Sequence, residues 1–304
     1  MALSILSNTA ATKAAFAMNS NNVQLNKSLN RLSSGKQIVT PADDAGGLAV
    51  SMKLGSSIAR NKSIVANIQN AMSFGEVQDG ALSSAAKIVD RMAELTALSL
   101  DVMKSTTDVA NYSTEFKALQ NQLFDLTTEK FNGVSLFNST SGKTFGTDVD
   151  NVEVITSDQG GAGAKVSMSK GLLLGAMTFS SFTATSAGAV GAAGVKSLAN
   201  ASGSEISIAS SSANNAFTLS FFAKATENIA TLRATSAAGL ARLQLAEDHV
   251  RLTVANLEAA NSRIMDVDVA AESTRFAKYN ILSQVSAAML VQANQTPATA
   301  LMLL

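Results

Sequence analysis

LNKSLNRLSSGKQIVTPADDAGGLAVS, residues 25–51, holds the end of one helical pattern and the beginning of the next. Leu25, Leu29 and Leu32 continue an apolar spacing of seven residues that starts further upstream. Such a narrow stripe is typical of a coiled coil and differs from the wide apolar face of a helix on a globular core. The turn-forming run SSGK (33–36) interrupts the stripe. We therefore predict two helices here, the first of them paired along a thin seam.

The second helix is expected to begin at Thr40-Pro41-Ala42-Asp43. Thr40 is a natural N-cap, and Pro41 suits the first helical position. Asp43 and Asp44 place negative charge at the positive end of the helix dipole. Two adjacent carboxylates could also serve catalysis or hold a metal, but stabilisation of the helix start is the interpretation that we favour.

The chain divides into three parts by composition. Residues 1–138 and 217–304 carry long helical stripes, whereas residues 139–216 hold eleven of the nineteen glycines. Within the middle part, short alternating segments predict strands joined by turns: VEVIT (152–156), KVSMS (165–169) and EISIA (205–209). We expect a small β-rich insert between two helical parts.

Near the C-terminus, a helix over about residues 270–292 is expected to turn Ile281, Val285 and Ala288 inward. Neither terminal helix can bury its apolar stripe alone, so each must pair with the other, with neighbouring helices or with other copies. The predicted fold is mainly α, a long antiparallel coiled-coil rod built from both chain ends with the β-rich insert in the middle.

The composition excludes several classes of function. Cys and Trp are absent, and His249, which has charged neighbours, is the one histidine. A disulfide framework, a thiol nucleophile and a zinc site built on Cys or clustered His are therefore impossible. Net charge is +0 at pH 7, so no charge excess attracts nucleic acid or an anionic membrane. We expect no catalytic, cofactor or metal site, and no membrane insertion.

The first ten residues, MALSILSNTA, lack a basic segment, and the first basic residue is Lys13. This beginning does not have the pattern of a cleaved secretory signal. We expect a protein that stays in the cytosol or leaves the cell without a cleaved leader.

Three segments carry a resemblance to a known family. Residues 25–51, quoted above, closely resemble the N-terminal signature of bacterial flagellins. NLEAANSRIMDVDVAAESTRFAKYNILSQVSAAMLVQANQTPATALMLL (256–304) resembles their C-terminal signature, and FNGVSLF (131–137) is similar to their link between helical core and variable insert. The resemblance covers about residues 1–138 and 225–304.

The resemblance implies a structural subunit that polymerises into the flagellar filament for swimming motility. It implies export in unfolded form through the flagellar type III apparatus and an extracellular location. Expected partners are further copies of the chain, an export chaperone, and the hook-associated junction and cap proteins. By the same resemblance, residues 1–41 with 262–304 form an inner-tube domain, 42–138 with 217–261 a helical wall domain, and 139–216 an outer insert.

Several side chains are candidates for specific roles. The expected contacts in the tube are made by Leu25, Leu29, Leu32, Leu257, Ile281, Leu282 and Met289, for which packing within one chain is the simpler alternative. Asp266, Asp268 and Glu272 could coordinate a cation, but polar positions near a helix junction are the interpretation that we favour. Val291 stands where alanine is usual in the family, which changes the packing volume without changing the function.

Some flagellins are recognised by an innate immune Toll-like receptor through a wall helix. The matching stretch here retains Arg91, Glu94 and Leu95, but Ala93 stands where a second arginine is common. Receptor contact through these residues is therefore a hypothesis that binding measurements must decide.

Two alternatives remain open. A flagellin-like hook-filament junction protein shares the design of the end helices, although the ANQTP and SRIMDVDVAAE stretches favour a true flagellin. A peptidase in the insert would need a metal motif such as H-E-x-x-H, and residues 139–216 contain no histidine.

Overall fold

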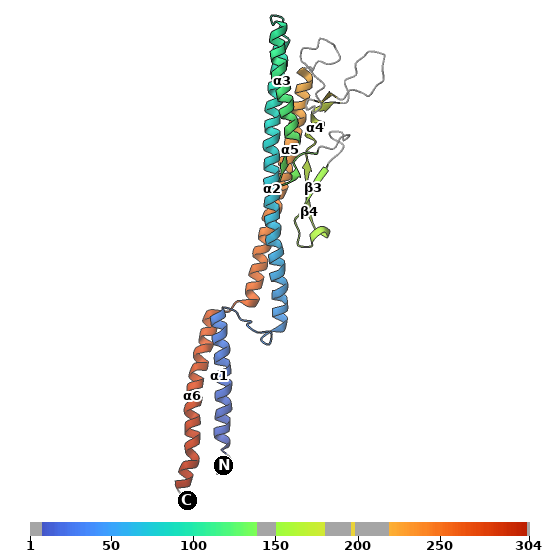
Figure 1. Ribbon diagram of the computed structural model, residues 1–304. Coiled ribbons are helices and arrows are strands. Elements are labelled where there is room, and N and C mark those ends of the chain that lie inside the picture. The colour runs from blue at the N-terminus through green and yellow to red at the C-terminus, as the bar shows by residue number, and fades with distance from the viewer. Residues whose placement is uncertain (1–7, 139–149, 180–195, 198–218, 303–304) are drawn as a thin grey trace. The chain divides into compact units, whose positions relative to one another are not determined.

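The computed structural model describes residues 8–138, 150–179, 196–197 and 219–302 (Figure 1). The chain forms two compact units, a terminal unit of residues 1–60 with 253–304 and a central unit of residues 61–252. Long helices come from both ends of the chain, and short strands lie between them in sequence. The predicted fold class, mainly α with antiparallel helices from both ends and a small β insert, is confirmed.

In the terminal unit, α1 (Thr9–Ser34) and α6 (Val269–Met302) lie side by side and antiparallel (Figure 1). The seam on α1 repeats with alternating steps of three and four residues through positions that are buried or half-buried: Ala11, Ala14, Met18, Asn21, Leu25, Ser28 and Leu32. This confirms the thin coiled-coil stripe. The seam uses Ser28, only 3% exposed, rather than Leu29, which is 49% exposed.

Polar side chains link α1 to α6. Asn21 Nδ2 donates to Ser286 Oγ at 2.9 Å, and Ser283 Oγ donates to Asn22 Oδ1 at 2.7 Å. At the far end, Asn8 Nδ2 donates to the carbonyl of Ala293 at 2.8 Å. A slip in register would leave these partly buried groups unpaired, so the bonds favour one alignment of the two helices.

This pairing corrects the expected orientation of α6. Ile281, Val285 and Ala288 were expected to face inward, yet all three are exposed. Ser283 and Ser286 face α1 because they hydrogen-bond to it, and the apolar residues two positions away on the helix consequently point outward.

In the central unit, the parts of α2 (Ala45–Ser99) and α5 (Leu219–Met265) that fall within residues 61–252 share one apolar core with α3 (Thr106–Thr127). Large side chains that are fully buried come from all three helices, including Leu82, Met92, Phe116 and Phe222. Asp79 and Arg233 join α2 to α5 through Arg233 Nε at 2.8 Å. The capping box at Ser105 and Asp108 begins α3.

The strands form antiparallel pairs. β1 (Lys130–Phe131) pairs with β2 (Val134–Ser135), and β5 (Thr178–Phe179) pairs with β6 (Lys196–Ser197). β3 (Asp150–Ile155) pairs with β4 (Lys165–Lys170) across a turn that contains the 3₁₀ segment Gly160–Ala162. A short helix, α4 (Leu173–Ala176), follows. The two strands predicted at VEVIT and KVSMS are confirmed, while EISIA lies outside the described residues.

The β3–β4 hairpin packs closely on the helices of the central unit. A Cβ at Gly75 would lie 2.6 Å from Leu240 Cδ2 and 2.8 Å from Met168 Cε, so only glycine fits there without a shift. Gln78 Nε2 donates to the carbonyls of Leu136 and Ser169 at 3.0 and 3.2 Å. The root of the insert is thereby fixed on α2.

The start of α2 differs from the prediction. Thr40–Asp43 forms a separate turn, and α2 begins at Ala45. Asp44 is the N-cap, because its Oδ1 accepts from the Gly47 amide at 2.9 Å and its carbonyl accepts from the Leu48 amide. Asp43 instead folds back and accepts from the amide and hydroxyl of Thr40, both at 3.1 Å. Thr40 and Pro41 therefore do not start the helix.

The predicted boundary at 41/42 lies in the break between α1 and α2, and the one at 261/262 lies within α5, whereas the two compact units divide at 60/61 and 252/253. The division of the chain into tube, wall and insert remains a prediction. None of the described helices is long and apolar enough to span a membrane.

Candidate assembly surfaces

The loop between α1 and α2 meets the break between α5 and α6 within the terminal unit. The Gln37 amide donates to the Met265 carbonyl at 2.6 Å, and the Val267 amide donates to the Gly35 carbonyl at 3.1 Å. Gly35 adopts a left-handed conformation at the end of α1, with φ 68°. These backbone bonds hold the two helix breaks of the unit together.

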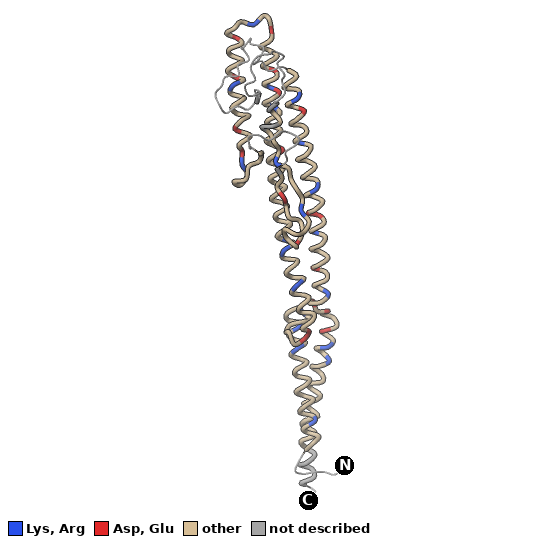
Figure 2. The backbone as a smooth tube through the Cα atoms, turned by 90° about the vertical axis from the view of Figure 1, so that its right-hand side faces the viewer, with Lys and Arg blue, Asp and Glu red and all other residues tan. Residues whose placement is uncertain are grey.

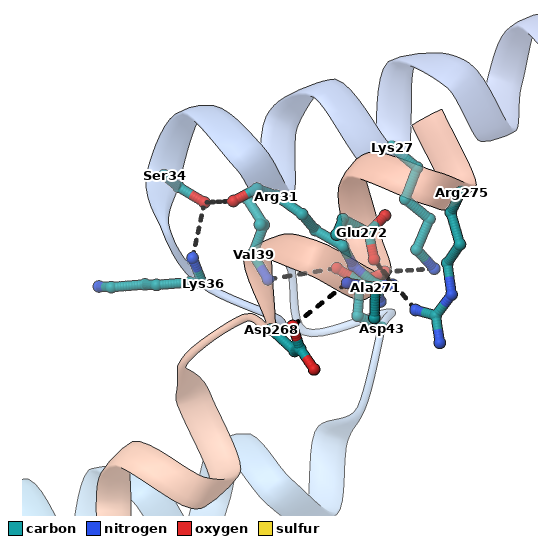
Figure 3. A network of polar contacts seen from close by, with 10 residues as sticks. All are labelled: Lys27, Arg31, Ser34, Lys36, Val39, Asp43, Asp268, Ala271, Glu272 and Arg275. Carbon is teal, nitrogen blue, oxygen red and sulfur yellow. Dashed lines mark hydrogen bonds and ion pairs between the residues drawn. The ribbon is translucent and has the colours of Figure 1, made fainter. Parts of the chain in front are cut away.

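Five charged side chains gather around this loop, and we call them the junction cluster: Lys27, Arg31, Asp43, Glu272 and Arg275 (Figure 3). Lys27 Nζ lies 2.6 Å from Asp43 Oδ1, and Arg275 NH1 lies 3.0 Å from Glu272 Oε2. Arg31 lies between the two carboxylates, at 3.9 Å from each. The cluster ties α1, the loop and α6 together by charge.

The environment of Asp43 stabilises its charged form. The hydrogen bond from Lys27 holds the pKa of Asp43 well below its ordinary value, and the bond from the Thr40 amide adds to the effect. Glu272 is only 2% exposed, which makes its contact with Arg275 a partly buried ion pair. Removing either carboxylate would leave Arg31, whose side chain is only 16% exposed, with a single carboxylate nearby, whereas Lys27 and Arg275 are 41% and 57% exposed.

We expect Asp43→Asn to lower the thermal unfolding midpoint of the terminal unit at pH 7 by about 2–4 °C. A carboxylate with a lowered pKa stabilises the fold above its ordinary pKa of 3.8, and that stabilisation is lost as the pH falls toward the lowered value. The difference between the two proteins should therefore shrink below about pH 4. Circular dichroism melts over pH 2–7 measure it. Asp44→Asn is the control, since asparagine also caps helices, and equal melts for Asp43→Asn and wild type at pH 7 would contradict the prediction.

The acidic residues near α6 do not converge on a cation site. Asp268 caps α6 by accepting from the Ala270 and Ala271 amides at 2.9 and 3.2 Å, while Asp266 accepts from Ser262 Oγ at 2.5 Å. Glu272 faces Arg275. Among the residues that the structure describes, no group of three acidic, His or Cys side chains has the arrangement of a metal site.

Apolar side chains form outward-facing stripes on both terminal helices. On α6, Ile281, Val285 and Met289 follow at steps of four residues and are 60%, 50% and 62% exposed. On α1, Phe16 and Val23 lie on one face and are exposed, and Leu29 is exposed on another face. We call Ile281, Val285 and Met289 the α6 stripe, and Phe16 with Val23 the α1 stripe. Exposed apolar surface of this kind is a mark of a contact with another protein surface.

Charged residues are absent from these stretches of the two helices. The sequence from Tyr279 to Met302 on α6 contains no Asp, Glu, Lys or Arg, and neither does the α1 segment of residues 14–26. Figure 2 shows this charge-free region in the tan parts of α1 and α6. Burial of such surface against another subunit removes few charges from water, so its desolvation cost is low.

Family models match both helical parts of the chain. The bacterial flagellin N-terminal helical region matches residues 5–142, and the bacterial flagellin C-terminal helical region matches residues 219–304. The flagellin of Bacillus subtilis (strain 168) is 30% identical across 98% of both chains. The chain belongs to the bacterial flagellins. It is also 31% identical to the flagellar filament 30.7 kDa core protein of Treponema maltophilum, across 93% of both chains.

The structure distributes the proposed contact residues of this flagellin over two environments. Leu25, Leu32, Leu257 and Leu282 are half-buried and serve packing within the terminal unit. Leu29, Ile281 and Met289 are exposed, and the latter two belong to the α6 stripe. Their contribution to assembly stays a prediction, but the second group has no comparable role in packing within one chain.

The stretch matched to the receptor motif is held by ion pairs in this flagellin. Arg91 Nε and NH2 donate to the two carboxylate oxygens of Glu115 at 2.8 and 3.2 Å, and NH1 donates to Glu94 at 2.7 Å. The pKa of Arg91 is raised, mainly by its bond to Glu115. Leu95 is fully buried in the core, so it offers no surface to a receptor without unfolding.

Sequence reasoning missed two exposed apolar sites in the central unit. Leu245 and Leu252 on α5 are 71% and 62% exposed. They are seven residues apart in the sequence, as are the buried pair Leu243 and Val250, and this second spacing could have indicated an exposed apolar site. Val102 and Met103, between α2 and α3, are also strongly exposed.

His249, the one histidine of the sequence, lies on the exposed side of α5.

Proposed function

We propose that this flagellin is the structural subunit of a bacterial flagellar filament that serves swimming motility. The observation that carries the proposal is the α6 stripe, an exposed apolar surface on a helix whose last two dozen described residues carry no charge. Its relatives include proteins named as flagellins and as flagellar filament core proteins. The α1 stripe supports the same role, because each of the two helices keeps an exposed apolar face after they have paired with each other.

The remaining parts of the proposal follow from family membership. The chain is exported unfolded through the flagellar type III apparatus, and its working location is outside the cell. Its partners are further copies of itself, an export chaperone, and the hook-associated junction and cap proteins. It performs no catalysis, and its role is mechanical.

Seeded assembly tests the proposal. Purified protein added to short filament fragments should extend them to micrometre length, as followed by electron microscopy and sedimentation. Persistent monomer under conditions where the Bacillus subtilis flagellin polymerises would instead support the junction-protein alternative.

Contact with an innate immune receptor is a separate proposal, supported only by Arg91 and Glu94, both exposed on α2. Because Glu94 and Glu115 engage Arg91, we expect weak binding of the native monomer to the receptor ectodomain. Ala93→Arg should strengthen it by adding a cation beside the engaged one. Surface plasmon resonance measures both proteins, and equal affinity would remove Ala93 as the reason for weak recognition.

A further inference from the structure

A groove of about 340 Å³ lies in the terminal unit between α1 and the loop that follows it. Val23 and Val39 give it an apolar part. Its polar part comes from Asn26, Asn30, Thr40 and three members of the junction cluster, which are Lys27, Arg31 and Asp43. Val23 also belongs to the α1 stripe, so the groove is continuous with the surface already proposed for assembly.

Arg31 is the least satisfied charge in the junction cluster. Its Nε is buried, and among the described residues this nitrogen has no hydrogen-bond partner. Its two carboxylate neighbours lie at 3.9 Å, beyond hydrogen-bond distance, and each has a closer cation in Lys27 or Arg275. The cluster holds three cations and two carboxylates, so one positive charge is left over.

The groove is lined by two cations, Lys27 and Arg31, and by one carboxylate, Asp43, which pairs with Lys27. The excess positive charge lies on Arg31, and it favours a carboxylate as the ligand. A guanidinium presents several donors in a plane that matches the two oxygens of a carboxylate, and the amides of Asn26 and Asn30 add further donors at the rim. The apolar walls at Val23 and Val39 suit the aliphatic stem of an acidic side chain.

We propose that this groove receives an acidic side chain from a second copy of the chain during assembly. Charge complementarity and the continuity of the groove with the α1 stripe support this occupant. The inference rests on the proposed function, and it assigns to Arg31 and Asn30 a polar contact between subunits in addition to the apolar stripes.

Asn30 allows the charge of the groove to be changed without touching the junction cluster. Asn30 is exposed, and within the described part of the chain its side chain makes no hydrogen bond. Asn30→Asp should raise the critical concentration for seeded growth roughly fivefold by repelling the incoming carboxylate, whereas Asn30→Lys should leave it equal or lower. The effect of Asn30→Asp should decrease as salt is raised from low to about 0.5 M, since ions screen it.

Charges near the end of α1 also act on the helix dipole, so a control is needed. Ser33→Asp and Ser33→Lys make the same charge changes in the last turn at an exposed residue that does not line the groove. Because Ser33 does not line the groove, the critical concentrations of the Ser33→Asp and Ser33→Lys variants should lie within about twofold of each other. Arg31→Lys should retain more of the assembly than Arg31→Gln, because it keeps the charge.

Three outcomes would overturn the inference. They are equal critical concentrations for Asn30→Asp and Asn30→Lys, better assembly of Asn30→Asp, or equally large differences within the Ser33 pair. Failure of the wild-type chain to extend any seed is a different result, because it overturns the proposed function itself.

Discussion

Deletion of residues 285–304 is expected to abolish filament growth while leaving the central unit folded. The deletion removes Ser286 and Ala293, which accept hydrogen bonds from Asn21 on α1 and from Asn8, the N-cap of α1. It also removes two of the three members of the α6 stripe. The first half of α1 then has no partner helix, and an isolated helix of that length is marginal in water.

The central unit should not respond to this deletion. Its core is built from α2, α3, α5 and the β3–β4 hairpin, and none of its buried members comes from residues 285–304. Sedimentation and electron microscopy after seeding measure the loss of assembly. Limited proteolysis followed by mass spectrometry should still yield a protected fragment within about residues 61–252. Normal filaments from the truncated chain would contradict the whole account of α6.

The sequence predicted the helical seams well and their exact faces poorly. A stripe of Leu25 and Leu32 at seven-residue spacing is enough to predict a coiled coil, and both residues are half-buried in the seam. Ser28 and Leu29 follow the seam residue Leu25 by three and four residues. Both spacings return to the same face of a helix, so spacing alone does not decide which of the two residues lies in the seam. Leu29 is the more apolar choice, yet the antiparallel partner selects Ser28.

The start of α2 shows a second limit of sequence reasoning. Thr40, which is followed by a proline, was predicted as the N-cap, and Asp44 was predicted only to add negative charge at the helix start. The structure uses Asp44, whose Oδ1 accepts a hydrogen bond from the Gly47 amide at 2.9 Å. A Cβ at Gly47 would lie 2.5 Å from Asp44 Oδ2 and 2.8 Å from Ile38 Cδ1. Ile38 is 5% exposed, so the burial of one loop residue contributes to the choice of cap. Such tertiary contacts have no signal in local sequence.

The junction cluster could not have been assembled from the sequence. Its five members come from α1, the loop and α6, and the longest separation between partners, from Arg31 to Glu272, spans most of the chain. Only the antiparallel pairing of α1 with α6 brings them together. The resemblance to flagellins predicted that pairing, but it did not predict which charges meet.

Ile281→Glu combined with Met289→Glu should raise the critical concentration for seeded growth at least tenfold. Both side chains are more than half exposed in the monomer, so their replacement removes little packing within the chain. In an assembled contact each glutamate would be buried without a cation, because α6 beyond Lys278 carries no charge and α1 carries none over residues 14–26. An unpaired charge of that kind costs several kcal/mol of association free energy.

The same substitutions separate assembly from folding. Glutamate is a good helix former, so the helix content of the monomer by circular dichroism should stay within about 5% of the wild-type value. Ile281→Leu with Met289→Leu keeps both sites apolar and should polymerise at nearly the wild-type critical concentration. Assembly of the double glutamate variant at that concentration would show that the α6 stripe remains in solvent in the filament. The polar groove beside Arg31 would then become the main candidate for contact between subunits.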